Sequence, residues 1–544
     1  MSSAPRVERS ERLRVERLAG MPGGDASRLI ADYVRGEPAL DPFFGRRVAS
    51  LDDFEPPPRT RSLLDAGGRR ALVKVLRDSP GVVPSAAAQQ ESLAALEDES
   101  TLAVVTGQQP GLFLGSLLTL YKATSVIGLA RRLSKRLSRT VVPVFWLVSE
   151  DDDLSEISET RLVTGKEESR LVRLFPDPAA AEKRTYASIR GRDLSESAAR
   201  QVVDLLPEGP ARGEIIDSLL ASAREETPVR SFAKLLGSLL APYGLVILDP
   251  SDARIKQLAA PFVAREMRAL HATAAAARAA GERLEDLGYH AQVRVDGERS
   301  ALFDVRDGRR ARADAASAVE SIAPGVLIRP AYQDFLLPTI AYVGGPAEVA
   351  YLAQVGESYE RHEVPRPVAL PRLSAILVEP ETAAFLERSR LDLASLRNGG
   401  GAPAPEAPLP DELLAVRDPA ESLDAALLAL SARLASIAPP LEAMVGGARK
   451  KIRHEIERVI ESARKQLDRD AEMLRRRSAR ARERLFPDGK PQERVYSPLT
   501  FLVQWPDLIE TLIDAYDPSD ARPILIALPA AERGTLPGPG VSSQ

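Results

Sequence analysis

The feature that most constrains the fold is a strand–helix–strand pattern between residues 101 and 149. Residues 101–107 (TLAVVTG) and 140–149 (TVVPVFWLVS) are short apolar runs, largely β-branched or aromatic, and they predict buried strands. Between them, residues 116–137 carry apolar side chains mostly on one face of a 3.6-residue period, which predicts a helix. Because parallel strands need a long crossover connection, this pattern predicts a βαβ unit whose two strands are parallel neighbours.

Other apolar runs extend this pattern along the chain. Strands are predicted within residues 244–250, 366–380 and 521–531, and residues 291–314 contain two Asp-Gly pairs that are typical of hairpin turns. The pattern favours an α/β fold, with a parallel-sheet core and small antiparallel insertions. We expect residues 1–100 to form a lead-in that packs on the core. The core itself should comprise residues 101–397, with β-rich insertions at about 155–240 and 285–325. A linker at 398–412, a coiled coil at 413–486 and a segment that returns to the core at 487–544 should follow.

The segment beyond the linker has a heptad pattern. Apolar residues recur three or four positions apart from Leu423 to Met444, and a second register runs from Ile452 to Leu474. Heptads over this length predict a coiled coil, and the Pro-Pro pair at 439–440 between the registers favours an antiparallel hairpin over one continuous rod. Its basic residues are interleaved with Glu and Asp, which is typical of a solvated surface rather than a nucleic-acid interface.

Composition narrows the classes of function. The 544 residues include no cysteine, which excludes disulfides, thiolate metal sites and a cysteine nucleophile. The formal net charge of −4 is not that of a nucleic-acid-binding protein, and no stretch approaches the ~20 apolar residues that span a bilayer. The first residues lack the apolar core of a signal peptide. We therefore expect a cytoplasmic protein without a nucleic-acid or membrane partner.

A glycine- and amide-rich loop follows the first strand of the βαβ unit. It contains Thr106, Gly107, Gln108, Gln109 and Gly111, and parallel sheets bind ligands at such loops, beyond the carboxyl ends of their strands. The glycines would let backbone approach a ligand, and the amides can donate and accept hydrogen bonds. The loop matches neither the GxGxxG fingerprint nor the Walker A motif. A ligand-binding loop and a structural turn capped by amides both stay open.

Four acidic residues, Glu150 to Asp153, follow the second strand and should lie at the same edge of the sheet. Carboxylates placed directly after a buried strand need solvent, an ion pair or a cation, and Mg²⁺ with a nucleotide phosphate prefers such oxygens. A helix start with an acidic first turn explains one or two of the four equally well. The residues alone leave both interpretations open, and they identify no metal ligand.

A third polar cluster comes later in the chain. It comprises Arg329, Gln333, Asp334, Gly344, Gly345 and Glu348. The glycines and a following Pro346 open a predicted helix, so they again offer bare backbone to a ligand, and proline suits the first helical position. Two short segments add His290, Gln292 and Arg372, and a lone histidine is more often a structural residue than a catalyst.

Taken together and in this order, the motifs resemble the cysteine-adding enzyme family of bacillithiol biosynthesis. They are VTGQQPGLFLG, VPVFWLVSEDDD, GYHAQV, RPAYQDFLLPTIAYVGGPAEVAYLAQ, PRLS and LFPDGKPQERVYSPLTFL, and they cover roughly residues 100–510. The resemblance implies a Rossmann-like core with connecting-peptide-like insertions and a coiled coil that supports a homodimer. It also implies a ligase that joins L-cysteine through its carboxyl group to the amine of glucosaminyl-malate, giving bacillithiol, with ATP and Mg²⁺ by analogy with related cores.

The residues and the resemblance together suggest roles. As catalytic residues we expect Gln108, Gln109, Glu150, Asp151, Asp153, Arg329, Gln333 and Asp334. As cofactor-binding residues we expect Thr106, Gly107, Gly111, Lys122, Gly344, Gly345 and Glu348. In this scheme Lys122 contacts a phosphate and Arg329 clamps the malate carboxylates, because a guanidinium can bind a carboxylate through two parallel hydrogen bonds.

One residue departs from the family's pattern. The family usually has Glu-Asp-His-Asp where this chain has four acidic residues, so Asp152 replaces a histidine. An imidazole can donate a proton near neutral pH, whereas a carboxyl group with an ordinary pKa cannot. Two alternatives to the family's reaction therefore stay open. They are a non-catalytic, dimeric, nucleotide-binding scaffold and an amide-forming ligase with another amino acid or acceptor.

Overall fold

The computed structural model describes residues 13–17, 26–45, 47–48, 50–55, 63–164, 168–175, 183–297, 299–389, 391, 393–397, 415 and 417–530. The chain divides into two compact units. The first contains residues 1–380 and 491–544, and the second contains residues 381–490. No helix among the described residues combines the length and apolarity needed to cross a membrane.

A five-stranded parallel sheet forms the centre of the first unit. Its strands follow the order β11 (Val368–Pro371), β10 (Thr339–Gly344), β2 (Leu102–Gln108), β3 (Val141–Leu147) and β6 (Val246–Leu248). All four neighbouring pairs are parallel. Helix α5 (Leu117–Leu137) connects β2 to β3, so the βαβ unit predicted from the sequence is confirmed.

Both faces of this sheet are buried, because the side chains of its strands alternate between two hydrophobic cores. On β3, Phe145 belongs to the core that contains the buried face of α5, whereas Trp146 belongs to a second core. All seven residues of β3 are buried. A strand covered on both faces favours apolar side chains at every position, which explains the uninterrupted apolar run at residues 141–147.

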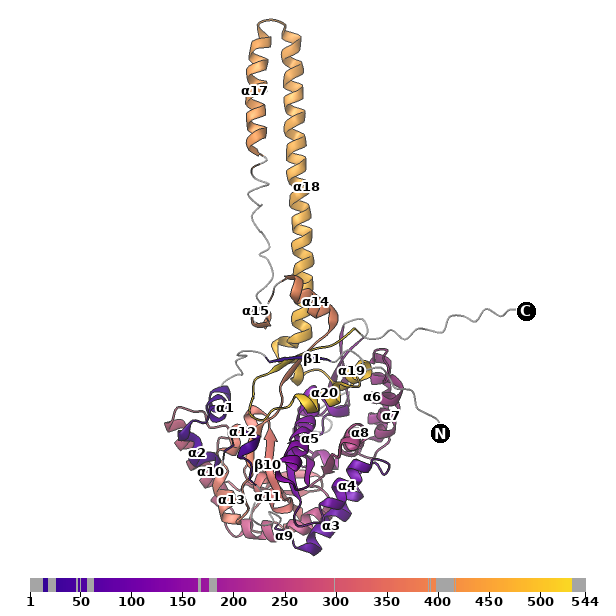
Figure 1. Ribbon diagram of the computed structural model, residues 1–544, viewed down its shortest axis with the longest axis vertical. Helices are drawn as coiled ribbons and strands as arrows, with labels where there is room; N and C mark the ends of the chain where they lie inside the picture. Colours follow the sequence, from indigo (N-terminus) through magenta and orange to yellow (C-terminus); the bar gives the residue numbers. More distant parts are fainter. Residues whose placement is uncertain are drawn as a thin grey trace, which may run out of the picture. The chain divides into compact units, whose positions relative to one another are not determined.

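Helices surround the sheet (Figure 1). In chain order, those of the first unit besides α5 are α1 (Ala26–Arg35), α2 (Asp41–Phe44), α3 (Ala66–Arg77), α4 (Ala87–Ala95), α6 (Arg192–Leu205), α7 (Arg212–Ala223), α8 (Pro228–Leu240), α9 (Ala253–Met267), α10 (Ala272–Asp286), α11 (Arg329–Leu336), α12 (Pro346–Leu352), α13 (Gly356–His362), α19 (Pro498–Gln504) and α20 (Leu508–Ala515). The first four lie in the lead-in, and Leu72 of α3 and Leu93 of α4 are buried in the second core. The described lead-in therefore packs on the core.

Two insertions were predicted to be rich in β-structure, and only the later one is. Residues 285–325 contain a three-stranded antiparallel sheet of β7 (Leu302–Arg306), β8 (Arg309–Arg312) and β9 (Ile322–Pro324). The β7–β8 turn is Asp307-Gly308, with positive φ angles of 53° and 73°, as a two-residue hairpin turn favours. The other predicted turn, Asp296-Gly297, has no neighbouring strand within residues 291–297.

The earlier insertion, residues 155–240, is mainly helical, so this prediction was wrong. A short hairpin of β4 (Glu159–Val163) and β5 (Ser169–Arg173) is followed by α6, α7 and α8. Buried residues in these helices recur at helical spacing, such as Ala198 with Val202. This spacing of four residues corresponds to one helical turn.

The C-terminal strand joins a second sheet rather than the main one. Strand β13 (Ile524–Ala527) pairs in parallel with β12 (Ala375–Val378) and antiparallel with β1 (Arg14–Arg17). The predicted strand region 366–380 therefore contains two strands, β11 and β12, which belong to different sheets. Strand β1 lies in the lead-in, where no strand was predicted.

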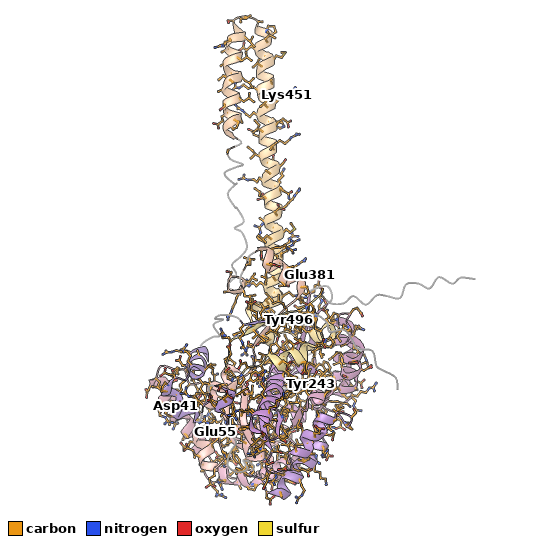
Figure 2. The ribbon with its side chains drawn as sticks, in the orientation of Figure 1. Asp41, Glu55, Tyr243, Glu381, Lys451 and Tyr496 are labelled. Atoms are coloured by element: carbon orange, nitrogen blue, oxygen red, sulfur yellow. The ribbon has the colours of Figure 1, made fainter. Side chains whose placement is uncertain are left out.

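The second unit contains the predicted helical hairpin. Its helices are α14 (Pro380–Ser389), α15 (Leu393–Arg397), α17 (Arg417–Ala435) and α18 (Pro439–Leu485). Helices α17 and α18 run side by side in opposite directions (Figure 1), and the Pro-Pro pair begins α18, where the break was predicted. Asp424 of α17 accepts hydrogen bonds of 2.7 and 2.6 Å from Arg449 of α18. Figure 2 labels Lys451 on the same helix. Residues 398–412, the predicted linker, lie outside the described residues.

Candidate functional site

A pocket of about 380 Å³ opens at the carboxyl edge of the main sheet, where β2, β3 and β10 end. Gly107 to Gln109 line it from β2, Ser149 to Asp151 from β3, and Gly345 with Glu348 from β10. These segments meet because the carboxyl ends of parallel strands share one edge of a sheet. The volume lies within the ~300–1,000 Å³ range of small-molecule sites. The three segments singled out in the sequence thus meet at one pocket, although not all of their residues line it, and the roles of these residues remain predictions.

The two glutamines of the first loop are anchored by charged partners. Gln108 accepts a 2.7 Å hydrogen bond from the Lys122 ammonium, and donates to Gln109 at 3.3 Å. Gln109 donates to the carboxylate of Glu156 and, at 3.5 Å, to Asp151. Burial raises the pKa of Glu156, and the neighbouring acidic side chains add to the shift. Both amides line the pocket in fixed orientations, as a polar ligand would require.

The glycines of this loop have different structural roles. Gly107 lines the pocket, and a Cβ there would lie 3.2 Å from the carbonyl oxygen of Trp146. Gly111 does not line the pocket, and a Cβ there would lie 2.9 Å from the Cα of Gly115. Thr106 is fully buried and does not reach the pocket. The cofactor contacts expected of Gly111 and Thr106 are therefore not supported, because Gly111 serves the close approach of two backbone segments.

Lys122 links the carboxyl end of β2 to helix α12. Its Nζ donates to the carbonyl oxygen of Gly107 and to Gln108, both at 2.7 Å, and it lies 2.5 Å from the carboxylate of Glu348. Three acceptors use all three donors of an ammonium group. Burial lowers the pKa of Lys122, against the opposing effect of Glu348. Lys122 is thus a buried cross-link at the pocket wall, and its hydrogens are not available for the predicted phosphate contact.

Glu348 completes this cross-link from α12. It accepts hydrogen bonds from the backbone N–H of Gly345 at 2.7 Å and from the hydroxyl of Tyr342 at 3.1 Å. Burial opposes its ionisation, but the Lys122 ammonium and the Gly345 N–H together outweigh burial and lower the pKa of Glu348. Gly345 lines the pocket, whereas Gly344 does not. A Cβ at Gly344 would lie 3.0 Å from that of Glu348. Gly344 therefore serves packing rather than the predicted ligand contact.

Glu150 is a buried carboxyl group in the pocket wall. It is 9% exposed, and its Oε1 lies 2.5 Å from Lys256 Nζ. Burial raises the pKa of Glu150 to about 7, although the Lys256 ammonium opposes this shift and the Asp249 carboxylate adds to it. A carboxyl group that exchanges its proton near neutral pH inside a small-molecule pocket has the property of a general base.

Asp151 and Asp152 share one arginine from the inserted sheet. The Arg310 Nη1 atom lies 2.5 Å from Asp151 and 3.3 Å from Asp152. The guanidinium carbon stands 3.6 Å from the centre of the Phe303 ring. Arg310 was not singled out in the sequence, and it supplies from 159 residues away the positive charge that these carboxylates need.

Asp153 is a helix cap rather than a pocket residue. Its Oδ1 accepts hydrogen bonds from the backbone N–H and the hydroxyl of Ser155, at 3.1 and 2.6 Å. This is the capping interpretation that the sequence left open, and it leaves the catalytic role predicted for Asp153 without support. In the described part of the chain, no group of three or more His, Cys, Asp or Glu side chains could hold a metal ion.

Arg329 lines the pocket, whereas Gln333 and Asp334 lie behind it. The three side chains are 7%, 0% and 2% exposed. Arg329 donates to Gln333 at 3.4 Å and to the hydroxyl of Tyr351. Asp334 accepts hydrogen bonds from Gln333 at 2.9 Å and from Tyr359 at 2.5 Å. Gln333 and Asp334 therefore form a buried network that supports Arg329, in place of the substrate contacts predicted for them.

Two more arginines line the pocket. Arg372 is 5% exposed and donates to Glu493 at 3.1 and 2.6 Å. Its Nε is buried and has no hydrogen-bond partner among the described residues. Arg494 follows Glu493 in the chain, and its side chain is exposed. Arg372 was noted in the sequence without a role, and Arg494 was not singled out. His290 is exposed and does not line the pocket.

The fold and the pocket define the class of protein. It is an α/β protein with a Rossmann-like parallel sheet, a small-molecule pocket at the carboxyl edge of that sheet and a helical hairpin in a second unit. Two family models match the chain. The N-terminal Rossmann-like domain of bacillithiol biosynthesis BshC matches residues 17–319 and 313–373, and the C-terminal coiled-coil domain of BshC matches residues 412–528. The chain belongs to the BshC family.

Curated relatives carry the name "Putative cysteine ligase BshC". The protein of Koribacter versatilis is 32% identical over 528 residues, which cover 90% of this chain and 95% of that protein. The protein of Heliobacterium modesticaldum is 33% identical over 514 residues, covering 86% and 90%. The protein of Salinibacter ruber is 32% identical over 450 residues, covering 77% and 81%. The likeness therefore extends over both the sheet unit and the hairpin.

Proposed function

We propose that the protein is a ligase that joins the carboxyl group of L-cysteine to the amine of glucosaminyl-malate, giving bacillithiol in the last step of its biosynthesis. Support comes from membership of the BshC family and from relatives whose names say cysteine ligase. The observation that carries the proposal is Glu150, a buried carboxyl group with a pKa of about 7 in the wall of a small-molecule pocket. We also propose that the protein acts in the cytoplasm, where ATP is supplied.

Glu150 accepts the proton that amide formation releases. The new bond joins the amine nitrogen to the carbonyl carbon of cysteine, one activated carboxylate oxygen leaves, and the nitrogen gives up a proton. A carboxylate whose pKa is near the working pH is an effective acceptor for that proton. Lys256, 2.5 Å from Glu150, stabilises the ionised form before the transfer.

ATP would supply the activation of the cysteine carboxylate, because a carboxylate oxygen is a poor leaving group. The residues present fit an anionic phosphate group. The unpartnered Nε of Arg372 lies 3.8 Å from the position that a Cβ on Gly345 would occupy, so a donor and bare backbone face the same space. Gly107 offers bare backbone at the end of the neighbouring strand β2. We propose Gly107, Gly345 and Arg372 as the residues that hold the nucleotide.

Mg²⁺ would enter with the ATP phosphates rather than on ligands of the protein. Asp151 and Asp152 already balance the charge of Arg310 at 2.5 and 3.3 Å. Elsewhere in the described residues no acidic or histidine cluster has the composition of a metal site. Two carboxylates face the single cation of Arg310, and we propose that the negative charge left over binds the amine of the acceptor.

The direct experiment is a reaction with purified full-length protein. Glucosaminyl-malate, cysteine, ATP and Mg²⁺ are incubated together, and mass spectrometry detects bacillithiol and the nucleotide products AMP or ADP. We expect bacillithiol with an equal amount of nucleotide product, and a loss of at least a hundredfold in E150Q, as removal of a general base causes. Bacillithiol without ATP would refute the activation step. Binding of all substrates without product would favour the non-catalytic scaffold instead.

We propose that the coiled coil forms a homodimer. Helix α18 has 47 residues and α17 has 19, so α17 can cover less than half of its partner. On α18, Val459, Leu467 and Met473 are 58%, 39% and 46% exposed. A second copy would bury these side chains as heptad packing does. Light scattering should give a dimer for the full-length protein and a monomer for V459E/L467E, whereas a wild-type monomer would refute the proposal.

A further inference from the structure

One cationic side chain of the pocket has neither a hydrogen-bond nor an ion-pair partner in the described part of the chain. Five cationic side chains line it, namely Lys122, Arg310, Arg329, Arg372 and Arg494. Lys122, Arg310 and Arg372 each have a carboxylate within 2.6 Å. Arg329 donates to a hydroxyl and an amide. Arg494 is exposed, and its side chain has no hydrogen-bond or ion-pair partner in the described part of the chain.

The backbone that carries Arg494 is nevertheless fixed. Gln492, two positions earlier, is 3% exposed, and its amide bonds to both backbone groups of Leu377 at 2.9 and 3.0 Å. Glu493 is 6% exposed and accepts two hydrogen bonds from Arg372. These anchors hold the residue at the pocket while its guanidinium stays open to solvent. A charged group on fixed backbone reduces the ordering cost of binding a ligand.

We propose that Arg494 binds a carboxylate of the acceptor substrate and so determines acceptor specificity. The inference rests on the proposed function. A guanidinium without a counter-ion matches a carboxylate or a phosphate, because its two parallel N–H groups fit two oxygens. Of the carboxylates in the proposed reaction, that of cysteine is consumed, whereas the two of the malate group stay charged throughout. A contact to a group that does not react raises the affinity for the acceptor without changing the chemical step.

Arg494 had no role in the sequence analysis, where Arg329 alone was expected to clamp the malate group. The structure separates the two arginines by their surroundings. Arg329 is 7% exposed and its guanidinium is held by Tyr351 and Gln333. The Arg494 side chain is exposed and has no partner among the described residues, so a charged acceptor entering the pocket can bind it without first displacing a protein group. Specificity for an anionic acceptor should therefore depend on Arg494.

The test is calorimetric binding to the full-length protein. Glucosaminyl-malate is titrated into wild-type protein, R494Q, R494K and K490Q, and the measurement is repeated with the dimethyl ester of the ligand. Loss of a charged hydrogen bond weakens binding about tenfold to a hundredfold. We expect this loss in R494Q with the free acid, a smaller loss in R494K, and less than about threefold change in R494Q with the ester, since the ester lacks the charge that Arg494 binds.

Lys490 is the matched control, because it is an exposed cation four residues away that does not line the pocket. K490Q should bind glucosaminyl-malate like the wild type. Equal binding by wild type and R494Q overturns the inference and leaves the proposed function intact. If R494Q weakens ATP instead of the acceptor, Arg494 serves a phosphate and the inference also falls. If wild-type protein does not bind glucosaminyl-malate, the proposed function fails and the inference fails with it.

Discussion

Removing the amine of Lys122 would leave a carboxylate in the pocket wall without its cation. The side chains of Lys122 and Glu348 are 3% and 22% exposed, and they lie 2.5 Å apart. Breaking a buried pair by removing one partner costs about 3–5 kcal/mol, because the remaining charge keeps its desolvation penalty. K122M should therefore lower the free energy of unfolding by about that amount. In K122M/E348Q the isolated charge is gone, so at least about 1 kcal/mol should return.

Urea denaturation followed by tryptophan fluorescence measures this effect. The chain has two tryptophans, Trp146 and Trp505, which are buried in the first unit and so report its unfolding. K135M on the same helix is the control, because Lys135 is exposed and its loss should change stability by less than about 0.5 kcal/mol. A cost below about 1 kcal/mol for K122M, or a double variant less stable than K122M, would contradict the buried cross-link.

Three further predictions concern the same site. Because burial raises the pKa of Glu150 from 4.5 to about 7, the folded state binds more protons than the unfolded state between these values. Stability should therefore fall by about 3 kcal/mol as pH rises through this range, and urea titrations at several pH values should show a flatter profile in E150Q. R310A removes the cation beside Asp151, so kcat/KM for amide formation should fall at least about tenfold, and unchanged kinetics would exclude a role for that pair. G111A places a Cβ 2.9 Å from the Cα of Gly115, so its urea midpoint should report a loss of about 1–3 kcal/mol, whereas a neutral effect would refute the packing role.

The parts of the fold that could be predicted from the sequence are those with a local periodic signal. Residues 101–149 predict the βαβ unit because burial on both faces forces an apolar run in each strand. The hairpin break at Pro439-Pro440 is equally local. Residues 155–240 were mispredicted as β-rich, although the buried residues in this segment recur at helical spacing. The second sheet could not be foreseen, since β1 and β13 come from opposite ends of the chain.

The candidate site could likewise be predicted from the sequence only where the signal is local. The loops after β2 and β3 were identified because strand ends of a parallel sheet share an edge, which requires no knowledge of long-range pairing. The loop after β10 was identified from its two glycines and the proline that opens the following helix. The identity of the pocket-lining side chains depends on such pairing. Gln333 and Asp334 were expected beside the ligand, but α11 directs them into the protein. Arg310 acts on Asp151 from 159 residues away, and nothing in either local sequence signals the pair.

We propose that the loops after β2, β3 and β10 form one ligand site. Hydrogen–deuterium exchange of the full-length protein with and without glucosaminyl-malate, cysteine and a non-hydrolysable ATP analogue measures whether they do. Joint protection is predicted for peptides containing Gln108, Asp151 and Gly345, with little change in the peptides of α18. Protection confined to one of these loops, or found only elsewhere in the chain, would contradict the account.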